Sequence, residues 1–406
     1  MKYAILFLWG CLSPSFAHAW SEHGMLTAEA ISGVSEIQKV TSVPGESLAG
    51  FLQAEQDTLM KLLAAEEGWL RRHQSHYPKR PDALIFVPTD DADLLVKRFL
   101  RAIRVNPELQ FQTPAAASAK DILIAASDEP DQGLDIGLFE NNGTAFGKEY
   151  GFGKQPFGNP LLSYGSQAPF HMGFYNEAWL SYQLAGYLRR TYPEFRIHLF
   201  RTLSEFSFQK GHAYWGYRFA GWAIHYIQDF TQPYHSTVVP GIGSARLLWL
   251  GVLDLFGNNE PKADQVQLVT NRHLVLEKYE AEIVKEAVTA KNSKSILLQA
   301  LREMSYDEDY GRYYDGYARA KVAFESNWFA NDTDAILEKT FPAKWVSDPS
   351  YHFSITEPDI QVLPALKDLP ADQKAEMEEF LANLMRHFGS HTRNFLKSVQ
   401  SYFQNS

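Results

Sequence analysis

Apolar side chains recur every three or four residues along most of the chain, and this spacing predicts amphipathic helices. Alternating apolar and polar residues, which would predict strands, are scarce. The pattern therefore predicts an all-α fold built as a multi-helix bundle. A weak point is expected at Gly211, because glycine disfavours helix interiors. The predicted helices span residues 52–73, 91–105, 176–192, 194–230, 263–291, 293–304, 307–329 and 371–403.

The segment 131–170 interrupts this helical pattern. It contains eight glycines, with aromatic residues between them. A loop this long inside a compact domain is usually functional or disordered, and the aromatic residues favour function. We therefore predict that this insertion forms the mouth of a site and selects the substrate. The aromatic side chains predicted to line that mouth are Phe139, Phe146, Tyr150, Phe152, Phe157 and Tyr164.

The first residues have the composition of a secretory signal peptide. Lys2 precedes a short apolar run, and Ala17-His18-Ala19 forms a small-x-small cleavage site. The apolar run is too short to cross a bilayer. We therefore predict that residues 1–19 are removed, that the mature chain begins at Trp20, and that the protein is exported to the periplasm or secreted.

Composition narrows the possible functions. Cys11 is the only cysteine and lies within the predicted signal peptide, so the mature protein does not depend on a disulfide. A lipid-modified Cys11 is an alternative that the bulky Trp9 disfavours. The formal charge of −10 disfavours a general nucleic-acid binder, because such proteins neutralise phosphates with a basic face. No later stretch approaches ~20 apolar residues, so no transmembrane helix is expected.

The sharpest chemical motif lies between residues 225 and 235. His225 and Asp229 are four residues apart, so a helix projects both from one face. Pro233 stops the helix, and His235 can fold back beside that face. A solvated i,i+4 pair is the alternative, but the flanking residues are apolar, and a buried histidine and carboxylate need partners. Imidazole and carboxylate groups together suit a zinc site.

Two further elements could add metal ligands. His273 and Glu277 also lie one helical turn apart inside an apolar run, where a buried ion pair is the alternative. At the predicted mature terminus, the amino group and carbonyl of Trp20 can chelate a metal. His23 would add an imidazole there, unless it is a solvated side chain.

These three elements together resemble the zinc-dependent phospholipase C / S1-P1 nuclease family. The match spans most of the mature chain. Members also carry a histidine before an aromatic segment, which His171 matches, and an upstream aspartate, which Asp131 matches. Asp128 and Asp135 compete with Asp131 for that position. The residues that carry the resemblance are Trp20, His23, Asp131, His171, His225, Asp229, His235, His273 and Glu277.

The resemblance implies a mainly α hydrolase that binds three Zn²⁺ ions, with Asp131 and Asp229 as catalytic residues. Asp229 would be shared between two of the ions. The implied ligands are Asp131, His171, His225 and Asp229 for the first ion, the backbone of Trp20 with His23 and Asp229 for the second, and His235, His273 and Glu277 for the third.

The resemblance also implies a phosphodiesterase that uses metal-activated water. Glu277 gives the HxxxE pattern of the family's lipases, whereas its nucleases usually carry HxxxD. We therefore predict a phospholipase C that cleaves glycerophospholipids, such as phosphatidylcholine, to diacylglycerol and a phosphorylated head group. Its partner is then phospholipid at a membrane surface, and nucleic acid is a partner only under the alternative of an S1/P1-type nuclease or nucleotidase. A non-catalytic exported zinc-binding protein is the third possibility.

We expect one zinc-hydrolase domain over residues 20–406, acting as a monomer, with a C-terminal helical extension from about 330 to 406. His387 and His391 are one turn apart on the last predicted helix. No carboxylate lies near them in the sequence, so we expect no function for this pair.

Overall fold

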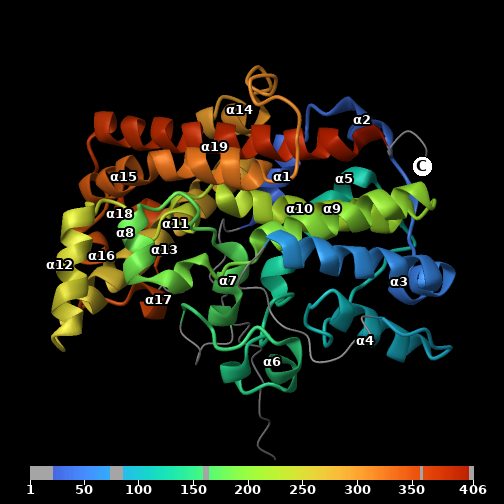
Figure 1. Ribbon diagram of the computed structural model, residues 1–406. Helices are drawn as coiled ribbons and strands as arrows, with labels where there is room; N and C mark the ends of the chain where they lie inside the picture. Colours follow the sequence, from blue (N-terminus) through green and yellow to red (C-terminus); the bar gives the residue numbers. More distant parts are fainter. Residues whose placement is uncertain (1–21, 74–85, 159–163, 357–359, 402–406) are drawn as a thin grey trace, which may run out of the picture.

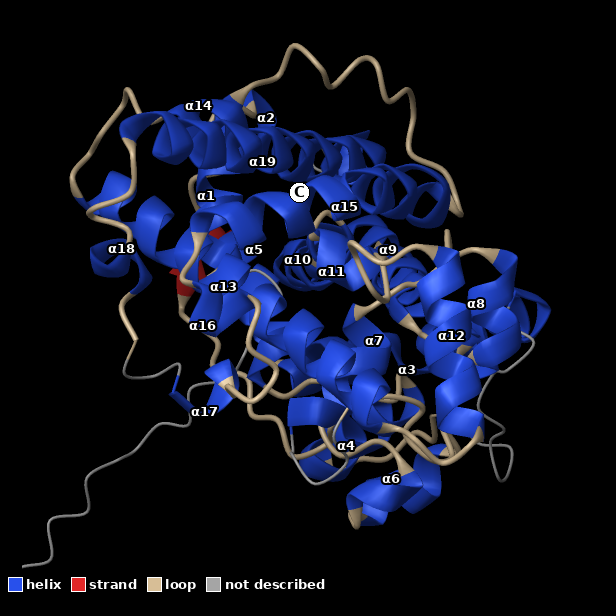
Figure 2. Ribbon diagram, turned by 90° about the vertical axis from the view of Figure 1, so that its left-hand side faces the viewer, coloured by secondary structure: helices blue, strands red, loops and turns tan. Residues whose placement is uncertain are grey.

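The computed structural model describes residues 22–73, 86–158, 164–356 and 360–401, and the protein is mainly helical, as predicted (Figure 1). The only strand pair in the described part of the chain joins β1 (Val43–Pro44) and β2 (Ala116–Ala117) in antiparallel orientation (Figure 2). The predicted signal peptide and Trp20 lie outside the described residues. Among the helices that are described, none combines the length and the apolar character needed to cross a membrane.

Helix α10 (Ala213–Phe230) is the central element of the fold. All but the first of its side chains are buried, as expected for a helix with apolar residues on every side. It packs against α9 (Pro193–Gln209), α5 (Ala119–Asp128) and α19 (Ala371–Val399) (Figure 1). The weak point predicted at Gly211 is confirmed, because this residue has a φ of 85° and separates α9 from α10.

The buried apolar side chains form two hydrophobic cores. The first contains residues of α5, α9 and α10, together with α3 (Leu48–His73) and α4 (Ala92–Ala102). Helix α19 contributes to both cores, with Phe395 in the first and Phe388 in the second. The second core also contains residues of α1 (His23–Ala30), α13 (Glu260–Thr289), α14 (Ile296–Arg302), α15 (Ala323–Thr340) and several shorter helices.

Short helical segments connect these long helices. They are α2 (Ser35–Lys39), η1 (Glu129–Gln132), η2 (Glu140–Asn142), α6 (Ala145–Tyr150), η3 (Tyr164–Gln167), α7 (Ala168–His171), α8 (Trp179–Leu184), η4 (Gly186–Arg189), α11 (Pro233–Ser236), α12 (Ser244–Leu255), η5 (Ala318–Val322), α16 (Ala343–Val346), α17 (Phe353–Thr356) and α18 (Val362–Ala365). Several of them carry the residues predicted to bind metal, so the site depends on short elements held by the long helices.

Two predicted helices were wrong. The range 176–192 contains only the short elements α8 and η4, and Glu177 at its start is held by a distant segment. The carboxylate of Glu177 accepts a hydrogen bond from the backbone N–H of Val238 at 2.8 Å. The first half of the range 307–329 consists of turns, and a π-helix, η5, then leads into α15. The other predicted helices correspond to α3, α4, α9, α10, α13, α14 and α19, with shifted ends.

The segment 131–170 is not an open loop, because it folds into short helical pieces. Phe139 and Phe152 pack against Phe170 and Tyr192, with ring centroids 4.8 to 6.4 Å apart. Tyr150 is buried beside them. The prediction that these three aromatic residues of the segment line a mouth is therefore wrong, because packing ring against ring buries their apolar surface. The remaining aromatic residues are Phe146 and Phe157, which are half-buried, and Tyr164, whose side chain is not described.

The region predicted as a C-terminal extension is part of the helical body. Residue 330 falls in the middle of α15, and α19 lies against α1, α10 and α14. The side chains of α19 enter both hydrophobic cores.

Candidate metal centre

The structure brings together the eight predicted metal ligands that it describes. Six elements carry them: α1, η1, α7, α10, α11 and α13. They form a five-residue cluster (His23, Asp131, His171, His225 and Asp229) and a three-residue cluster (His235, His273 and Glu277).

In the five-residue cluster, His171 and His225 face the same two carboxylates. His171 Nδ1 lies 2.9 Å from Asp229 Oδ2 and 3.6 Å from Asp131 Oδ1. His225 Nε2 lies 3.4 Å from Asp229 Oδ2 and 3.6 Å from Asp131 Oδ1. The two ring nitrogens are 3.1 Å apart. Donors bound to one tetrahedral ion at about 2.0–2.1 Å lie roughly 3.3 Å from one another, so the atoms of His171, His225 and Asp229 are spaced as ligands of a single ion, and Asp131 Oδ1 lies close to both nitrogens.

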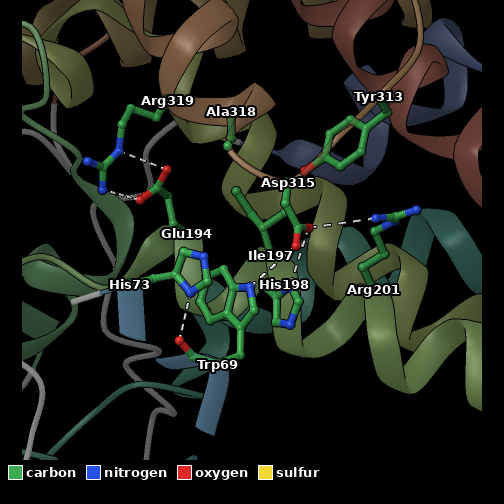
Figure 3. Close-up of a pocket in the computed structure, with 11 residues that line it drawn as sticks. Trp69, His73, Glu194, Ile197, His198, Arg201, Tyr313, Asp315, Ala318 and Arg319 are labelled. Carbon is green, nitrogen blue, oxygen red and sulfur yellow. Dashed lines mark hydrogen bonds and ion pairs between the residues drawn. The ribbon is translucent and has the colours of Figure 1, made fainter. Parts of the chain in front are cut away.

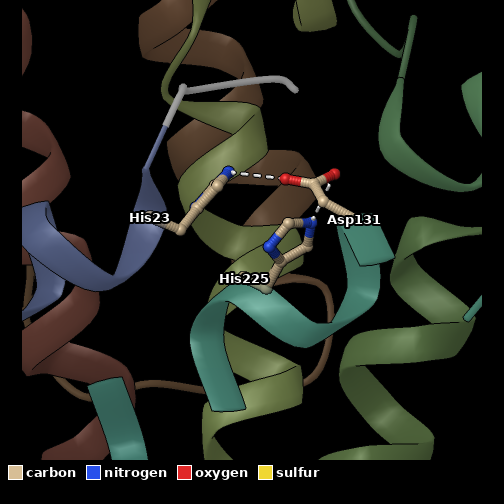
Figure 4. Close-up of side chains that lie close together, drawn as sticks. All are labelled: His23, Asp131 and His225. Carbon is tan, nitrogen blue, oxygen red and sulfur yellow. Dashed lines mark ion pairs between the residues drawn. The ribbon is translucent and has the colours of Figure 1, made fainter. Parts of the chain in front are cut away.

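His23 faces the second oxygen of each carboxylate. Its Nε2 lies 3.5 Å from Asp229 Oδ1. The same nitrogen lies 3.8 Å from Asp131 Oδ2 (Figure 4). Each carboxylate therefore presents one oxygen to His171 and His225 and the other to His23. This is the arrangement of carboxylates that bridge two metal positions. Such sharing was predicted for Asp229 but not for Asp131.

Oxygen acceptors hold the outer nitrogen of three imidazole rings. His225 Nδ1 donates to a carbonyl oxygen of α5 at 2.7 Å, and His235 Nδ1 donates to the carbonyl of His171 at 2.9 Å. His23 Nδ1 donates to Gln228 Oε1 at 2.8 Å. Because these oxygens can only accept, Nε2 of each ring is directed at the cluster, which is how orienting partners prepare a histidine for a metal. Gln228 was not predicted, since nothing in the sequence shows that it reaches α1.

The three-residue cluster converges on one carboxylate oxygen. Glu277 Oε1 lies 2.6 Å from His273 Nε2 and 3.7 Å from His235 Nε2. The two Nε2 atoms are 3.1 Å apart. The ring of Tyr234 stacks on His273 with a centroid separation of 5.6 Å. Two imidazoles and a carboxylate are a common set of three protein ligands at zinc sites with an open position.

A short stretch of backbone ties the two clusters together. The carbonyl of His171 accepts from the ring of His235, and the N–H of Gly173 donates to the carbonyl of His235 at 2.8 Å. His171 belongs to one cluster and His235 to the other. A shift of either backbone segment would therefore change the geometry of both clusters.

In the five-residue cluster, protonated histidines balance the negative charges of the two carboxylates. Burial opposes a charge on His23 and His171, but Asp229 and Asp131 outweigh it and raise the pKa to about 9 for His23 and about 10 for His171. Burial lowers the pKa of His225 to about 4. Burial would raise the pKa of Asp229, but the neighbouring histidines hold it well below its ordinary value. Two imidazolium groups thus neutralise two carboxylates, and a bound metal ion would displace those protons.

Asp229 has the surroundings of a metal ligand. It is fully buried, and imidazole nitrogens of His23, His171 and His225 face its oxygens. A buried carboxylate is unfavourable unless a cation compensates its charge. The residues present therefore fit metal ions, and the mixture of imidazole and carboxylate donors suits a divalent transition metal such as Zn²⁺.

The three aspartates that competed in the sequence occupy different positions. Asp128 accepts from the backbone N–H of Gly24 at 2.6 Å, at the start of α1. Asp135 pairs with Arg196 and accepts from the hydroxyl of Tyr226 at 2.6 Å. Its other contact is with His171 Nε2 at 3.5 Å, so Asp135 is placed to orient that ring. Asp131 alone among the three has both oxygens directed at the cluster.

Beside the three-residue cluster lies a buried acid that was not predicted from the sequence. Glu280 is fully buried on α13, and neither of its oxygens accepts a hydrogen bond. Burial, together with the charges of Glu22 and Glu277, raises its pKa well above its ordinary value. The folded protein therefore binds this proton more tightly than the unfolded chain. The resulting stabilisation is complete at acidic pH and is lost as the pH rises above about 4.5.

We expect Glu280→Gln to stabilise the metal-free protein at pH 8 by roughly 1–3 kcal/mol, because it removes an unpaired buried carboxylate. At pH 4 the gain should vanish, since the wild-type carboxyl group is already protonated. Thermal unfolding followed by circular dichroism at both pH values measures the difference. Glu286→Gln, an exposed position on the same helix, is the control and should change neither value. A variant less stable than the wild type at pH 8 would contradict this account.

A separate surface pocket contains none of the predicted site residues (Figure 3). There the ring of Trp69 lies between His73 and His198, with centroid distances of 4.2 and 3.9 Å. His198 pairs with Glu66 at 2.7 Å and with Asp315 at 3.3 Å. Burial would lower its pKa, but the two carboxylates outweigh it and raise the pKa to about 9. The charges in this pocket are matched within it, as in a structural ion-pair network.

The candidate centre is defined by this geometry. Comparison of the chain with protein-family models, with curated proteins and with solved structures gives no match. The protein has a mainly helical fold with buried histidine and carboxylate clusters that could hold metal ions.

Proposed function

We propose that the protein is a zinc-dependent phosphodiesterase of the phospholipase C type, with three bound ions. The observation that carries the proposal is the five-residue cluster, in which Asp131 and Asp229 each face His171 and His225 with one oxygen and His23 with the other. Metal ions held by such ligands supply Lewis-acid polarisation of a phosphoryl group and activation of a water molecule.

The residues of the cluster divide the remaining work between them. Asp229 is fully buried, so its part is to hold the metal positions at a fixed separation. Asp131 has 8% of its side-chain surface exposed, against 0% for Asp229, so it is the carboxylate that a water molecule can approach. It would orient that water and accept its proton. With a pKa of about 4, His225 is neutral at pH 7 and acts as a ligand rather than a proton carrier.

An exposed apolar face favours a lipid substrate. Helix α8 lies beside α12 at one end of the molecule, and both follow segments that carry cluster histidines (Figure 1). The exposed fraction is 70% for Trp179, 60% for Trp249 and 83% for Phe256. Tryptophan and leucine on a surface helix suit the interface of a bilayer, whereas nucleic acid would need a basic groove. This apolar face consists of Trp179, Leu184, Leu248, Trp249 and Phe256.

We expect the double variant Trp179→Ser/Trp249→Ser to bind phosphatidylcholine vesicles roughly 10- to 100-fold more weakly than the wild type, because two aromatic side chains no longer enter the interface. Hydrolysis of vesicle lipid should fall in parallel, while turnover of a short soluble phosphocholine ester stays within about twofold. Vesicle sedimentation and the two rate assays measure these effects. Leu94→Ser, at an exposed position on α4, serves as the control. Equal loss on the soluble ester would instead indicate damage to the site.

Turnover assays test the function itself. The wild-type protein should hydrolyse a chromogenic phosphocholine ester and phosphatidylcholine vesicles, lose both activities in a chelator, and regain them with Zn²⁺. Digestion of single-stranded DNA and RNA, tested beside them, should be slow. Rapid nuclease activity without lipid hydrolysis would establish the nuclease alternative. Full metal content without any turnover would identify a non-catalytic metal-binding protein.

A further inference from the structure

His387 and His391 face a carboxylate that is distant from them in the sequence. They lie one turn apart on α19, and α15 places Glu325 beside them. Glu325 Oε2 is 2.7 Å from His387 Nδ1 and 2.8 Å from His391 Nε2. The three donor atoms lie within 4.8 Å of one another. The sequence places no carboxylate near this pair, and the fold supplies one from another helix.

Two tyrosine hydroxyls complete the surroundings of this group. The hydroxyl of Tyr317 lies 2.9 Å from His391 Nδ1 and holds the outer nitrogen, so Nε2 is directed at Glu325. The hydroxyl of Tyr310 lies 2.8 Å from His387 Nδ1 and donates to Glu325 Oε1 at 3.0 Å. The orientation of His391 thus matches that of the cluster histidines, whose outer nitrogens are also held by oxygen atoms.

Burial and charge prepare the group for a cation. His391 is fully buried, and burial lowers its pKa. Burial would raise the pKa of Glu325, but His387 and His391 outweigh it and lower the pKa to about 2. The hydroxyl of Ser326 faces the same gap between the helices and is buried without a hydrogen bond, so the polar groups here are not all satisfied by one another.

The donor set repeats that of the three-residue cluster. Both groups consist of two imidazoles and one glutamate, with two of the three donors supplied from positions i and i+4 of one helix. The π-helix η5 lies directly before α15, within one turn of Glu325. π-helical turns are rare and occur frequently at functional sites, which agrees with a specialised role for this position.

We propose that Glu325, His387 and His391 form a further binding site for a divalent transition metal, with Zn²⁺ as the ion that its donors suit best. The ion would join α15 to α19. Helix α19 also carries Thr392, whose hydroxyl accepts from Gln228 Nε2 at 3.2 Å, and Gln228 in turn holds His23. The role of the ion is therefore structural support behind the five-residue cluster. This proposal does not depend on the reaction that the protein catalyses.

Metal counting tests the site. The full-length wild-type protein and its variants are dialysed against micromolar Zn²⁺, and zinc per chain is measured by elemental analysis. Glu325→Gln and His387→Gln should each hold one ion fewer than the wild type and keep the ions of the other clusters. Glu379→Gln, at an exposed position on α19, is the control and should retain all ions. Circular dichroism verifies that each variant keeps its helices.

A second measurement does not require the variants to fold. Anomalous diffraction at the zinc edge from wild-type crystals should show a peak between Glu325, His387 and His391. Absence of this peak, or equal zinc content in the wild type and a folded Glu325→Gln variant, would overturn the proposal. Neither measurement involves turnover, so this proposal and the proposed phosphodiesterase activity fail separately.

Discussion

Asp229→Asn should remove more than one metal ion per chain and reduce turnover by at least ~100-fold. Asp229 Oδ2 faces His171 and His225, whereas Oδ1 faces His23, so one side chain serves both halves of the five-residue cluster. Asparagine keeps the shape but loses the charge that holds cations in a buried site. Mutation of a residue that only orients a metal ligand typically reduces metal affinity or activity 10- to 100-fold. Elemental analysis and turnover of the phosphocholine ester give the two values.

Glu277→Gln provides the matched comparison. The predicted ligands that Glu277 contacts are His235 and His273, which belong to its own cluster. This variant should therefore lose one ion and keep those bound by Asp229. Circular dichroism of both variants establishes that the helices are intact. If Asp229→Asn retained as much zinc as the wild type, the bridging role of Asp229 would be refuted.

The overall association constant of the five-residue cluster for two Zn²⁺ ions should rise about 100-fold per pH unit between pH 6 and pH 8, which is about tenfold for each ion. In the metal-free protein the pKa is about 9 for His23 and about 10 for His171, so both rings carry a proton in this range. Each ring must release that proton to bind a metal, and two released protons give a slope of two in log affinity against pH. The affinity increases with pH and levels off above pH 9 to 10.

Chelator competition at several pH values measures this slope, and calorimetry in buffers of different ionisation enthalpy counts the released protons. The double variant Glu277→Gln/Glu325→Gln isolates the five-residue cluster, because it removes the carboxylates of the other two groups. Burial lowers the pKa of His273 to about 4, so that histidine adds no proton release in this range. A slope below one would show that the imidazoles of the five-residue cluster are already neutral before the metal binds.

The long helices and the pairs of ligands carried on them could be read from the sequence. Apolar periodicity is a local property of the sequence. The apolar residues around His225 and Asp229 were enough to predict that α10 is buried on every side. The same holds for His273 and Glu277 on α13, which the helix places on one face whatever surrounds it. The sequence alone therefore determined the all-α class and both i,i+4 pairs of candidate ligands.

Only the tertiary structure decided how these pairs combine with the rest of the site. Asp128, Asp131 and Asp135 lie close together in the chain, and their different partners depend on which helix reaches each one. Likewise, Glu325 meets His387 and His391 because α15 packs against α19, a contact between positions more than 60 residues apart. The aromatic residues of 131–170 had no local signal either, since burying them against one another required the rest of the core. Contacts between distant segments depend on packing, and packing is fixed by the whole chain rather than by any one motif.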